Sequence, residues 1–143
     1  MKCSDIMKKD VICVRPTDTV QHAARLMRDE GIGFLPVCDE DGRALGAITD
    51  RDIVVRIVAD GHPGQTTVRE AMTQEVVACK ADDDVRLVER MMARNQKARM
   101  MVIDHVGRLV GVISLSDVVE RETDAARAAR TAREVSRREI RGA

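Results

Sequence analysis

The chain passes from a predicted strand into a predicted helix at Gly46-Ala47-Ile48-Thr49-Asp50-Arg51-Asp52. Small and apolar residues end the strand, and Thr49 is a favourable N-cap for the helix that follows. Asp52 stands at the third helical position, so Thr49 and Asp52 spell a capping box in which Asp replaces the usual Glu or Gln. The same pattern returns as Gly111-Val112-Ile113-Ser114-Leu115-Ser116-Asp117. Two copies at a fixed distance predict a repeated architecture.

The repeat extends over most of the chain. Shifting the sequence by 65 residues aligns its two halves without a gap, so that Asp5-Ile6-Met7 falls on Glu70-Ala71-Met72. Most other overlaid positions keep their polarity, which indicates an internal duplication. We expect one unit at residues 1–62 and a second at residues 63–121.

Each half predicts the element order β-α-β-β-α. In the first half these elements are a strand (11–14), a helix capped within 16–18 and stopped at 31–33, two hairpin strands (34–38 and 44–48) and a final helix (50–60). The helical crossover favours parallel pairing of the first two strands, and the hairpin is antiparallel. One such unit leaves apolar surface uncovered. We therefore expect an α/β (α+β) fold in which two units pack sheet to sheet with pseudo-twofold symmetry.

Composition excludes several classes of partner. The formal net charge of the 143 residues is zero, which argues against a nucleic-acid partner. Phe34 is the only aromatic residue, so a stacking platform for single strands is excluded. There is no apolar run of roughly 20 residues and no signal-peptide pattern. We expect a cytoplasmic protein with no membrane partner.

The cysteines do not form a metal-binding pattern. Cys3, Cys13, Cys38 and Cys79 include no C-x-x-C pair, so we predict no metal site and, for the most part, small buried hydrophobic side chains. Cys13 and Cys38 end two strands that we expect to be parallel neighbours, which would bring their sulfurs to the same end. They are interpreted either as an oxidisable pair or as two buried thiols.

The last segment, residues 122–143, has no counterpart in the first half. It is rich in Ala, Arg and Glu and is expected to continue the final helix. Its arginines recur at helical spacing: Arg127, Arg130, Arg133, Arg137, Arg138 and Arg141. Three interpretations stay open: a solvated helix face, contact with nucleic acid or an acidic partner, or docking on a second subunit. The docking face would consist of Ala125, Ala129, Ala132 and Ser136.

The duplicated unit, with its closing pattern G-h-h-[ST]-x-x-D, resembles the cystathionine-β-synthase (CBS) domain family. The tandem is similar to the paired arrangement called a Bateman module, here standing alone. The resemblance covers about Ser4 to Arg121. The motifs that carry it are Asp5-Ile6-Met7, Gly31–Val37 and Leu45–Ile53 in the first unit, and Ala71-Met72, Val102–Asp104 and Gly107–Val118 in the second.

The resemblance implies a regulatory module. Such modules bind adenosine-containing nucleotides (AMP, ADP or ATP; S-adenosylmethionine or NAD more rarely) in clefts between the two units, and transmit a conformational change to a partner. They generally form homodimers. The alternative is a ligand-free structural or protein-interaction module that docks through its C-terminal helix and is redox-responsive through Cys13 and Cys38. We expect no catalytic activity and no required cofactor, because the sequence shows no nucleophile–base pair, metal cluster or P-loop.

The predicted nucleotide-binding residues are Thr49, Arg51, Asp52, Arg99, Ser114, Ser116 and Asp117. A carboxylate at a helix entrance can accept hydrogen bonds from both ribose hydroxyls. The adjacent hydroxyls and the first-turn N–H groups can face phosphate. Gly46 and Gly111 are expected to leave room for the ligand.

Alternatives remain open for several of these residues. The two [ST]-x-x-D patterns are also explained by helix capping alone. Arg99 and Arg51 suit either a ligand phosphate or solvent. Met101 stands where the family commonly has proline, beside an unusually polar segment at residues 95–98, which puts the shape of that pocket in doubt. Met100 and Met101 are expected to pack in the core.

Overall fold

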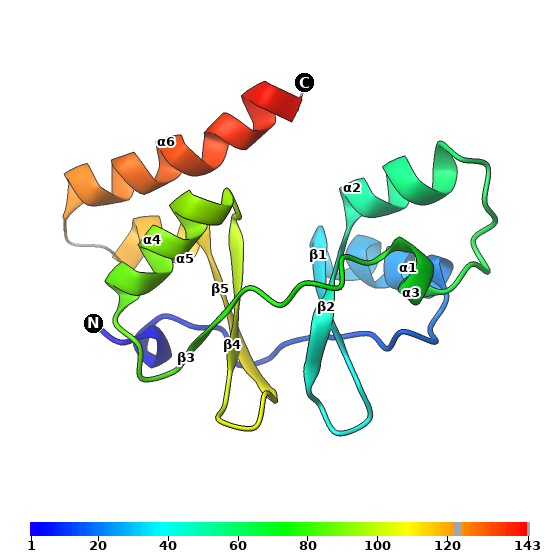
Figure 1. Ribbon diagram of the computed structural model, residues 1–143, viewed down its shortest axis with the longest axis horizontal. Coiled ribbons are helices and arrows are strands. Elements are labelled where there is room, and N and C mark those ends of the chain that lie inside the picture. Colours follow the sequence, from blue (N-terminus) through cyan, green and yellow to red (C-terminus); the bar gives the residue numbers. More distant parts are fainter. Residues whose placement is uncertain (122–123, 143) are drawn as a thin grey trace. The chain divides into compact units, whose positions relative to one another are not determined.

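The chain folds into two compact units of mixed α and β structure. The computed structural model describes residues 1–121 and 124–142, with side chains described up to residue 137. The three-stranded unit comprises Met1–Val11, Ala78–His105 and the chain from Val110 onward. The two-stranded unit comprises Ile12–Val77 and Val106–Leu109. Figure 1 shows the elements of both, and the mixed α+β class predicted from the sequence is confirmed.

The two-stranded unit is built on a hairpin. Its elements are α1 (Val20–Glu30), β1 (Phe34–Cys38), β2 (Ala44–Thr49), α2 (Asp50–Asp52), η2 (Ile53–Val58) and α3 (Val68–Ala71). The strands β1 and β2 are antiparallel, as predicted. The expected strand at residues 11–14 is reduced to one bridge, in which Val14 pairs in parallel with Val37. A core of buried aliphatic side chains from the hairpin and the helices, including Val20, Leu35 and Ile48, fills this unit.

Two predictions about the helices of this unit are corrected in detail. The N-cap of α1 is Thr19, whose Oγ1 accepts a hydrogen bond from His22 N at 3.0 Å, and not a residue within 16–18. The predicted helix over 50–60 is α-helical only at Asp50–Asp52 and continues as the π-helix η2. On this helix Ile57 is buried, whereas Val54, Val55 and Val58 are exposed.

The three-stranded unit repeats this plan with an added helix. Its elements are η1 (Cys3–Asp5), β3 (Ala78–Lys80), α4 (Val85–Asn95), β4 (Arg99–Ile103), β5 (Leu109–Ser114), α5 (Leu115–Arg121) and α6 (Ala125–Gly142). The strands β3 and β4 are parallel, with Cys79 opposite Val102, as the crossover predicts. Met100 and Met101 are buried, which confirms their core role.

The polar segment after α4 has a backbone explanation. Gln96 ends α4 with a φ of 52°, in the left-handed region, where Gly31 ends α1 with a φ of 65°. The two positions correspond under the 65-residue shift. Glycine takes this conformation without a Cβ penalty, whereas glutamine does not. The second half therefore ends its helix in the same left-handed conformation as the first half, with glutamine in place of glycine.

Each compact unit is completed by a segment from the other half of the sequence. Lys8 exchanges backbone hydrogen bonds of 2.9 and 3.0 Å with Val112 on β5. Its counterpart in the repeat, Thr73, exchanges bonds of 3.1 and 2.9 Å with Ala47 on β2. The compact units therefore do not coincide with the sequence repeats. The boundaries 1–62 and 63–121 stay a prediction about the duplicated sequence.

The glycines of the repeated motif allow the Lys8 and Thr73 segments to approach the strands closely. A Cβ on Gly46 would lie 2.1 Å from the carbonyl oxygen of Thr73. A Cβ on Gly111 would lie 2.8 Å from Met7 Sδ and 3.0 Å from the carbonyl oxygen of Lys8. The expectation that these glycines leave room for a ligand is therefore wrong, because the space beside them is filled by the chain itself.

The C-terminal helix packs against its own unit. The predicted continuation of the final helix is wrong, because α5 ends at Arg121 and α6 is a separate helix in contact with α4 and α5. Residues 122, 123 and 143 of the predicted segment lie outside the described residues. The packed face of α6 consists of Ala128, Thr131 and Val135, all buried.

One arginine of α6 is not part of a solvated face. Arg127 Nε lies 3.0 Å from Glu89 Oε2 on α4, and the Glu89 side chain is only 2% exposed. The face proposed for docking lies beside the packed one: Ala125, Ala129 and Ser136 are exposed and Ala132 is half-buried. Docking through it stays a prediction. Among the described residues, we find no helix long and apolar enough to cross a membrane.

We predict that Gly46→Ala destabilises the protein by about 1–3 kcal/mol, because the new methyl group displaces the Thr73 segment from β2. The control is Gly64→Ala. Its added Cβ would lie 3.3 Å from Gln21 Cβ, against 2.1 Å from the Thr73 carbonyl oxygen at Gly46, so the neighbour needs to move only slightly. Chemical denaturation of both variants measures the difference. Equal stability of the two would contradict the close approach at Gly46.

We predict that Arg127→Ala lowers the free energy of unfolding by about 2 kcal/mol or more, because it leaves the buried Glu89 carboxylate without this cation. Arg130→Ala removes an exposed arginine from the same helix and should change stability by less than about 0.5 kcal/mol. Thermal denaturation compares them. A loss no larger than that of the control would show that the ion pair does not hold α6 on α4.

Candidate functional site

Both copies of the repeated motif form complete capping boxes. Asp52 N donates to Thr49 Oγ1 at 3.1 Å, and Thr49 N donates to Asp52 Oδ2 at 2.9 Å. In the second copy, Asp117 N donates to Ser114 Oγ at 3.1 Å and Ser114 N donates to Asp117 Oδ2 at 2.8 Å. The capping interpretation is therefore confirmed. Each carboxylate uses Oδ2 for the cap, which leaves Oδ1 as the oxygen for any further role.

The first helical turn of the first motif does not offer free N–H groups. Asp50 N donates to the carbonyl oxygen of Gly33 at 3.0 Å, Arg51 N donates to Asp50 Oδ1 at 2.8 Å, and Asp52 N donates to Thr49. The expectation that these groups face phosphate is therefore wrong for this motif. A phosphate at this motif would have to be bound by side chains.

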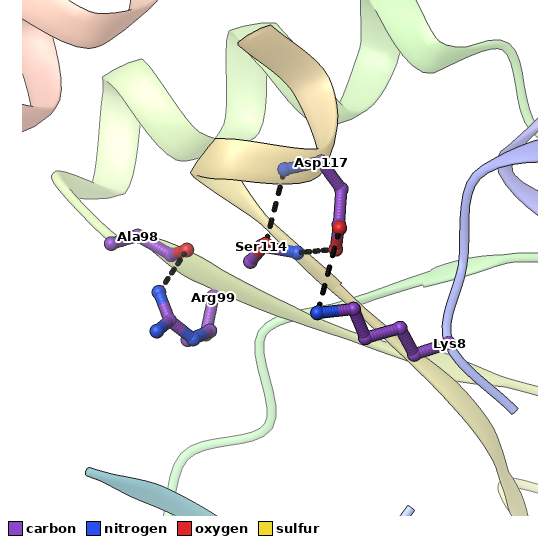
Figure 2. A network of polar contacts seen from close by, with 5 residues as sticks. All are labelled: Lys8, Ala98, Arg99, Ser114 and Asp117. Carbon is purple, nitrogen blue, oxygen red and sulfur yellow. Dashed lines mark hydrogen bonds and ion pairs between the residues drawn. The ribbon is translucent and has the colours of Figure 1, made fainter. Parts of the chain in front are cut away.

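The second motif has a cation beside its carboxylate. Lys8 Nζ lies 3.8 Å from Asp117 Oδ1, the oxygen that the cap does not use. The Asp117 side chain is 13% exposed and that of Lys8 is 74% exposed. Figure 2 shows Lys8 reaching Asp117 from a segment remote in sequence. The carboxylate is thus held by the fold, while the ammonium group stays accessible to solvent.

Arg99 supplies a second cation close to the same motif. Its Nη1 donates to the carbonyl oxygen of Ala98 at 3.1 Å, and Leu115 N donates to that oxygen at 2.8 Å. The Ala98 carbonyl thus joins the start of α5 to Arg99, and Figure 2 shows its bond with Arg99. The Arg99 side chain is exposed. Ser116 is also exposed, on the first turn of α5.

The two motifs differ in charge. In the first, the Asp50 carboxylate packs against Gly33, where a Cβ would lie 2.6 Å from Asp50 Oδ2. The second motif has Leu115 at the position of Asp50. Arg51 is exposed on the first motif. The first site therefore contains an extra carboxylate and the second contains two accessible cations.

The structure places the predicted site residues in two groups, one in each compact unit. Thr49, Arg51 and Asp52 lie in the two-stranded unit, and the group of Arg99, Ser114, Ser116 and Asp117 lies in the three-stranded unit. Sequence reasoning missed Lys8, which contacts Asp117 across 109 positions of the chain. No local pattern marks this lysine, because its position depends on pairing with β5.

Comparison with known proteins identifies the family. The CBS domain family matches residues 3–59 and 68–124. The chain belongs to the CBS domain family. The resemblance read from the repeated motif is thereby confirmed.

Several relatives match over most of this CBS chain. The CBS domain-containing protein YhcV of Bacillus subtilis is 38% identical over 114 residues, which cover 80% of each protein. The match spans 61% of the length of the uncharacterized protein MK0525 of Methanopyrus kandleri, at 30% identity over 82% of this chain.

Two solved structures of similar fold contain adenosine compounds. The CBS domain pair of protein MJ0100, in complex with 5′-methylthioadenosine and S-adenosyl-L-methionine, has a TM-score of 0.76 and 27% identity, covering 84% of this chain and 94% of that one. The cytosolic domain of the Mg²⁺ channel MgtE, in complex with ATP, has a TM-score of 0.73 and 31% identity, covering 83% of this chain and 48% of that one.

The predicted thiol pair lies in the two-stranded unit. The parallel bridge between Val14 and Val37 makes the segments that carry Cys13 and Cys38 neighbours, as expected. Cys38 is buried, but Cys13 is exposed, so the expectation of burial is wrong for Cys13. Burial raises the pKa of the Cys38 thiol to about 12, and the neighbouring Cys13 thiol adds to the shift. Oxidation of this pair stays a prediction.

We predict that Ser114→Ala lowers the free energy of unfolding by about 1 kcal/mol, because Asp117 N loses its capping acceptor. Ser116→Ala, at an exposed position two residues further on, should change it by less than about 0.5 kcal/mol. Urea denaturation of both variants measures the difference. If the two variants have equal stabilities, the hydroxyl of Ser114 does not act as a cap.

Proposed function

We propose that this CBS protein is a non-catalytic regulatory module that binds an adenine nucleotide, AMP, ADP or ATP, at the second motif. The observation that carries the proposal is the arrangement of Lys8 and Arg99 beside the capped carboxylate of Asp117. A nucleotide combines a sugar with two adjacent hydroxyl donors and an anionic phosphate. The motif offers an acceptor oxygen for the sugar hydroxyls and two cations for the phosphate.

Capping and ligand binding are compatible at Asp117. A carboxylate has about four lone-pair sites on two oxygens. Oδ2 accepts from Ser114 N, and the 3.8 Å separation between Lys8 Nζ and Oδ1 is longer than a hydrogen bond. A ribose hydroxyl can therefore donate to Oδ1 while the cap stays intact. Lys8 is then available to pair with phosphate.

The phosphate end of the ligand favours the second motif over the first. Lys8 and Arg99 correspond to Thr73 and Phe34 in the repeat, neither of which is charged. The first motif adds Asp50, which repels an anion. We therefore assign the phosphorylated ligand to the second motif, with Ser116 as a further hydroxyl, and an uncharged nucleoside such as 5′-methylthioadenosine to Thr49, Arg51 and Asp52.

The ligands of related structures support this class of compound. The MgtE domain binds ATP, and the MJ0100 pair binds 5′-methylthioadenosine and S-adenosyl-L-methionine. We rank the adenine nucleotide first here because S-adenosylmethionine carries no phosphate for Lys8 and Arg99 to bind. NAD is ranked below it as well.

The chain offers a route by which ligand binding at Lys8, in the three-stranded unit, acts on the two-stranded unit. The segment Met1–Val11 belongs to the three-stranded unit and continues directly at Ile12 into the two-stranded unit. A ligand that draws Lys8 away from Asp117 pulls on this connection. We propose that a regulated protein reads the resulting change, and that the module is a homodimer. The exposed valines of η2, Val54, Val55 and Val58, are candidates for the contact surface of the homodimer.

We predict that Lys8→Gln weakens ATP binding about tenfold, equivalent to ~1.4 kcal/mol, and leaves adenosine binding unchanged. Lys9→Gln is the matched control, because it removes an exposed lysine one position away. Isothermal titration calorimetry with both ligands separates the phosphate contribution from the nucleoside contribution.

A thermal-shift panel tests the whole proposal. A ligand at 100 times its Kd should stabilise the protein by about 2.7 kcal/mol. If AMP, ADP and ATP all leave the melting temperature unchanged at millimolar concentration, the nucleotide proposal fails and the ligand-free interaction module replaces it.

A further inference from the structure

The cysteines form a second close pair that sequence reasoning did not find. Cys79 Sγ donates to Cys3 Sγ at 3.7 Å in the three-stranded unit. Both thiols are buried, with exposures of 0% for Cys3 and 3% for Cys79. The two residues are 76 positions apart in the sequence. Their contact therefore results from the tertiary fold and not from local spacing.

Backbone hydrogen bonds hold the two sulfurs in place. Cys3 N donates to the carbonyl oxygen of Asp83 at 2.9 Å, and Ser4 N donates to that of Ala81 at 2.9 Å. These bonds join η1 to the turn that directly follows β3. Because Cys79 is the central residue of β3, the two side chains face each other from adjacent, fixed segments.

The duplicated fold does not require sulfur at either position. Under the 65-residue shift, Cys3 corresponds to Val68 and Cys79 corresponds to Val14. Both valines are buried, at 0% and 1% exposure, in one hydrophobic cluster of the two-stranded unit. Valine thus satisfies the packing in one unit, whereas the other has a thiol at both positions.

We propose that Cys3 and Cys79 are a redox-active dithiol that a peroxide converts into a disulfide. The Cys3 thiolate attacks the O–O bond, which yields a sulfenic acid on Cys3 and releases water after protonation. The Cys79 sulfur then attacks the Cys3 sulfur and expels a second water as the S–S bond forms. With hydrogen peroxide as the oxidant, two thiols lose two electrons and two protons, and one hydrogen peroxide becomes two waters.

The local environment assigns the order of the two cysteines. The hydrogen bond from Cys79 lowers the pKa of the Cys3 thiol, and the same bond, with burial, raises the pKa of Cys79. Cys3 is therefore the residue that ionises and attacks first. Access requires η1 to open locally, a single turn that follows the exposed Lys2 and ends at the exposed Asp5.

The disulfide would fasten the segment that pairs with β5. Cys3 lies five positions before Lys8 on Met1–Val11, and Cys79 lies on β3. The bond would close a long loop of the chain and hold this segment against the sheet when its backbone hydrogen bonds open. The proposal does not depend on nucleotide binding, because it concerns only the two sulfurs and their oxidant.

The experiment uses Cys13→Ser/Cys38→Ala, which retains only the new pair. The reduced protein is treated with a small excess of hydrogen peroxide, denatured, alkylated and weighed. We expect a mass about 2 Da lower, no alkylation, and a Cys3–Cys79 linked peptide that disappears on reduction with dithiothreitol. The melting temperature of the oxidised form should rise by roughly 10 °C.

Two further variants keep the result interpretable. Cys3→Val/Cys79→Val, which copies the residues of the other unit, should fold, show no peroxide-dependent mass change at these positions, and report on Cys13 and Cys38 alone. Cys79→Val should leave a Cys3 sulfenic acid that dimedone traps. Full alkylation of both thiols after peroxide, over-oxidation without a linked peptide, or a disulfide between two copies of the chain would each overturn the proposal.

Discussion

The close approach of backbone at Gly46 and Gly111 is the constraint on which the rest of the structure depends. The segment that contains Thr73 lies where a side chain at Gly46 would be, and the segment that contains Lys8 lies where a side chain at Gly111 would be. Each segment pairs there with an edge of the sheet and completes its unit. Because each unit takes this segment from the other half, neither half of the sequence contains all the parts of a unit. Each unit is thus built from segments of both repeats.

The segment that each unit takes from the other half of the sequence also determines which charged groups lie beside its motif. The capping boxes are equivalent in every hydrogen bond, so the duplicated sequence preserved the helix entrance faithfully. The residues brought in by the exchange are not equivalent, because Lys8 and Thr73 differ in charge. Among the residues that the structure describes, a cation forms an ion pair with Asp117 and none does so with Asp52. The asymmetry of the two candidate sites therefore lies in the incoming segments as well as in the replacement of Asp50 by Leu115 between the motifs.

A similar asymmetry separates the thiols. The duplicated positions 3 and 68, and 14 and 79, are all buried, yet one unit fills its pair with valine and the other with cysteine. Packing alone accepts both choices, since cysteine and valine are small and apolar. Chemistry distinguishes them, because only the sulfur pair can exchange electrons. The same segment, Met1–Val11, thus carries both the lysine beside Asp117 and one of the two sulfurs.

The sequence by itself determined the duplication, the hairpins and the capped helix entrances, because these depend on local spacing, turn residues and side-chain period. It also indicated the CBS family, the site carboxylates and the burial of Met100 and Met101. Only the tertiary structure decided the role of the glycines, the return of α6 onto α4, and the partners of Asp117 and Cys3. Each of these is a contact between residues far apart in the chain, and no local pattern records which distant segment fills a given space.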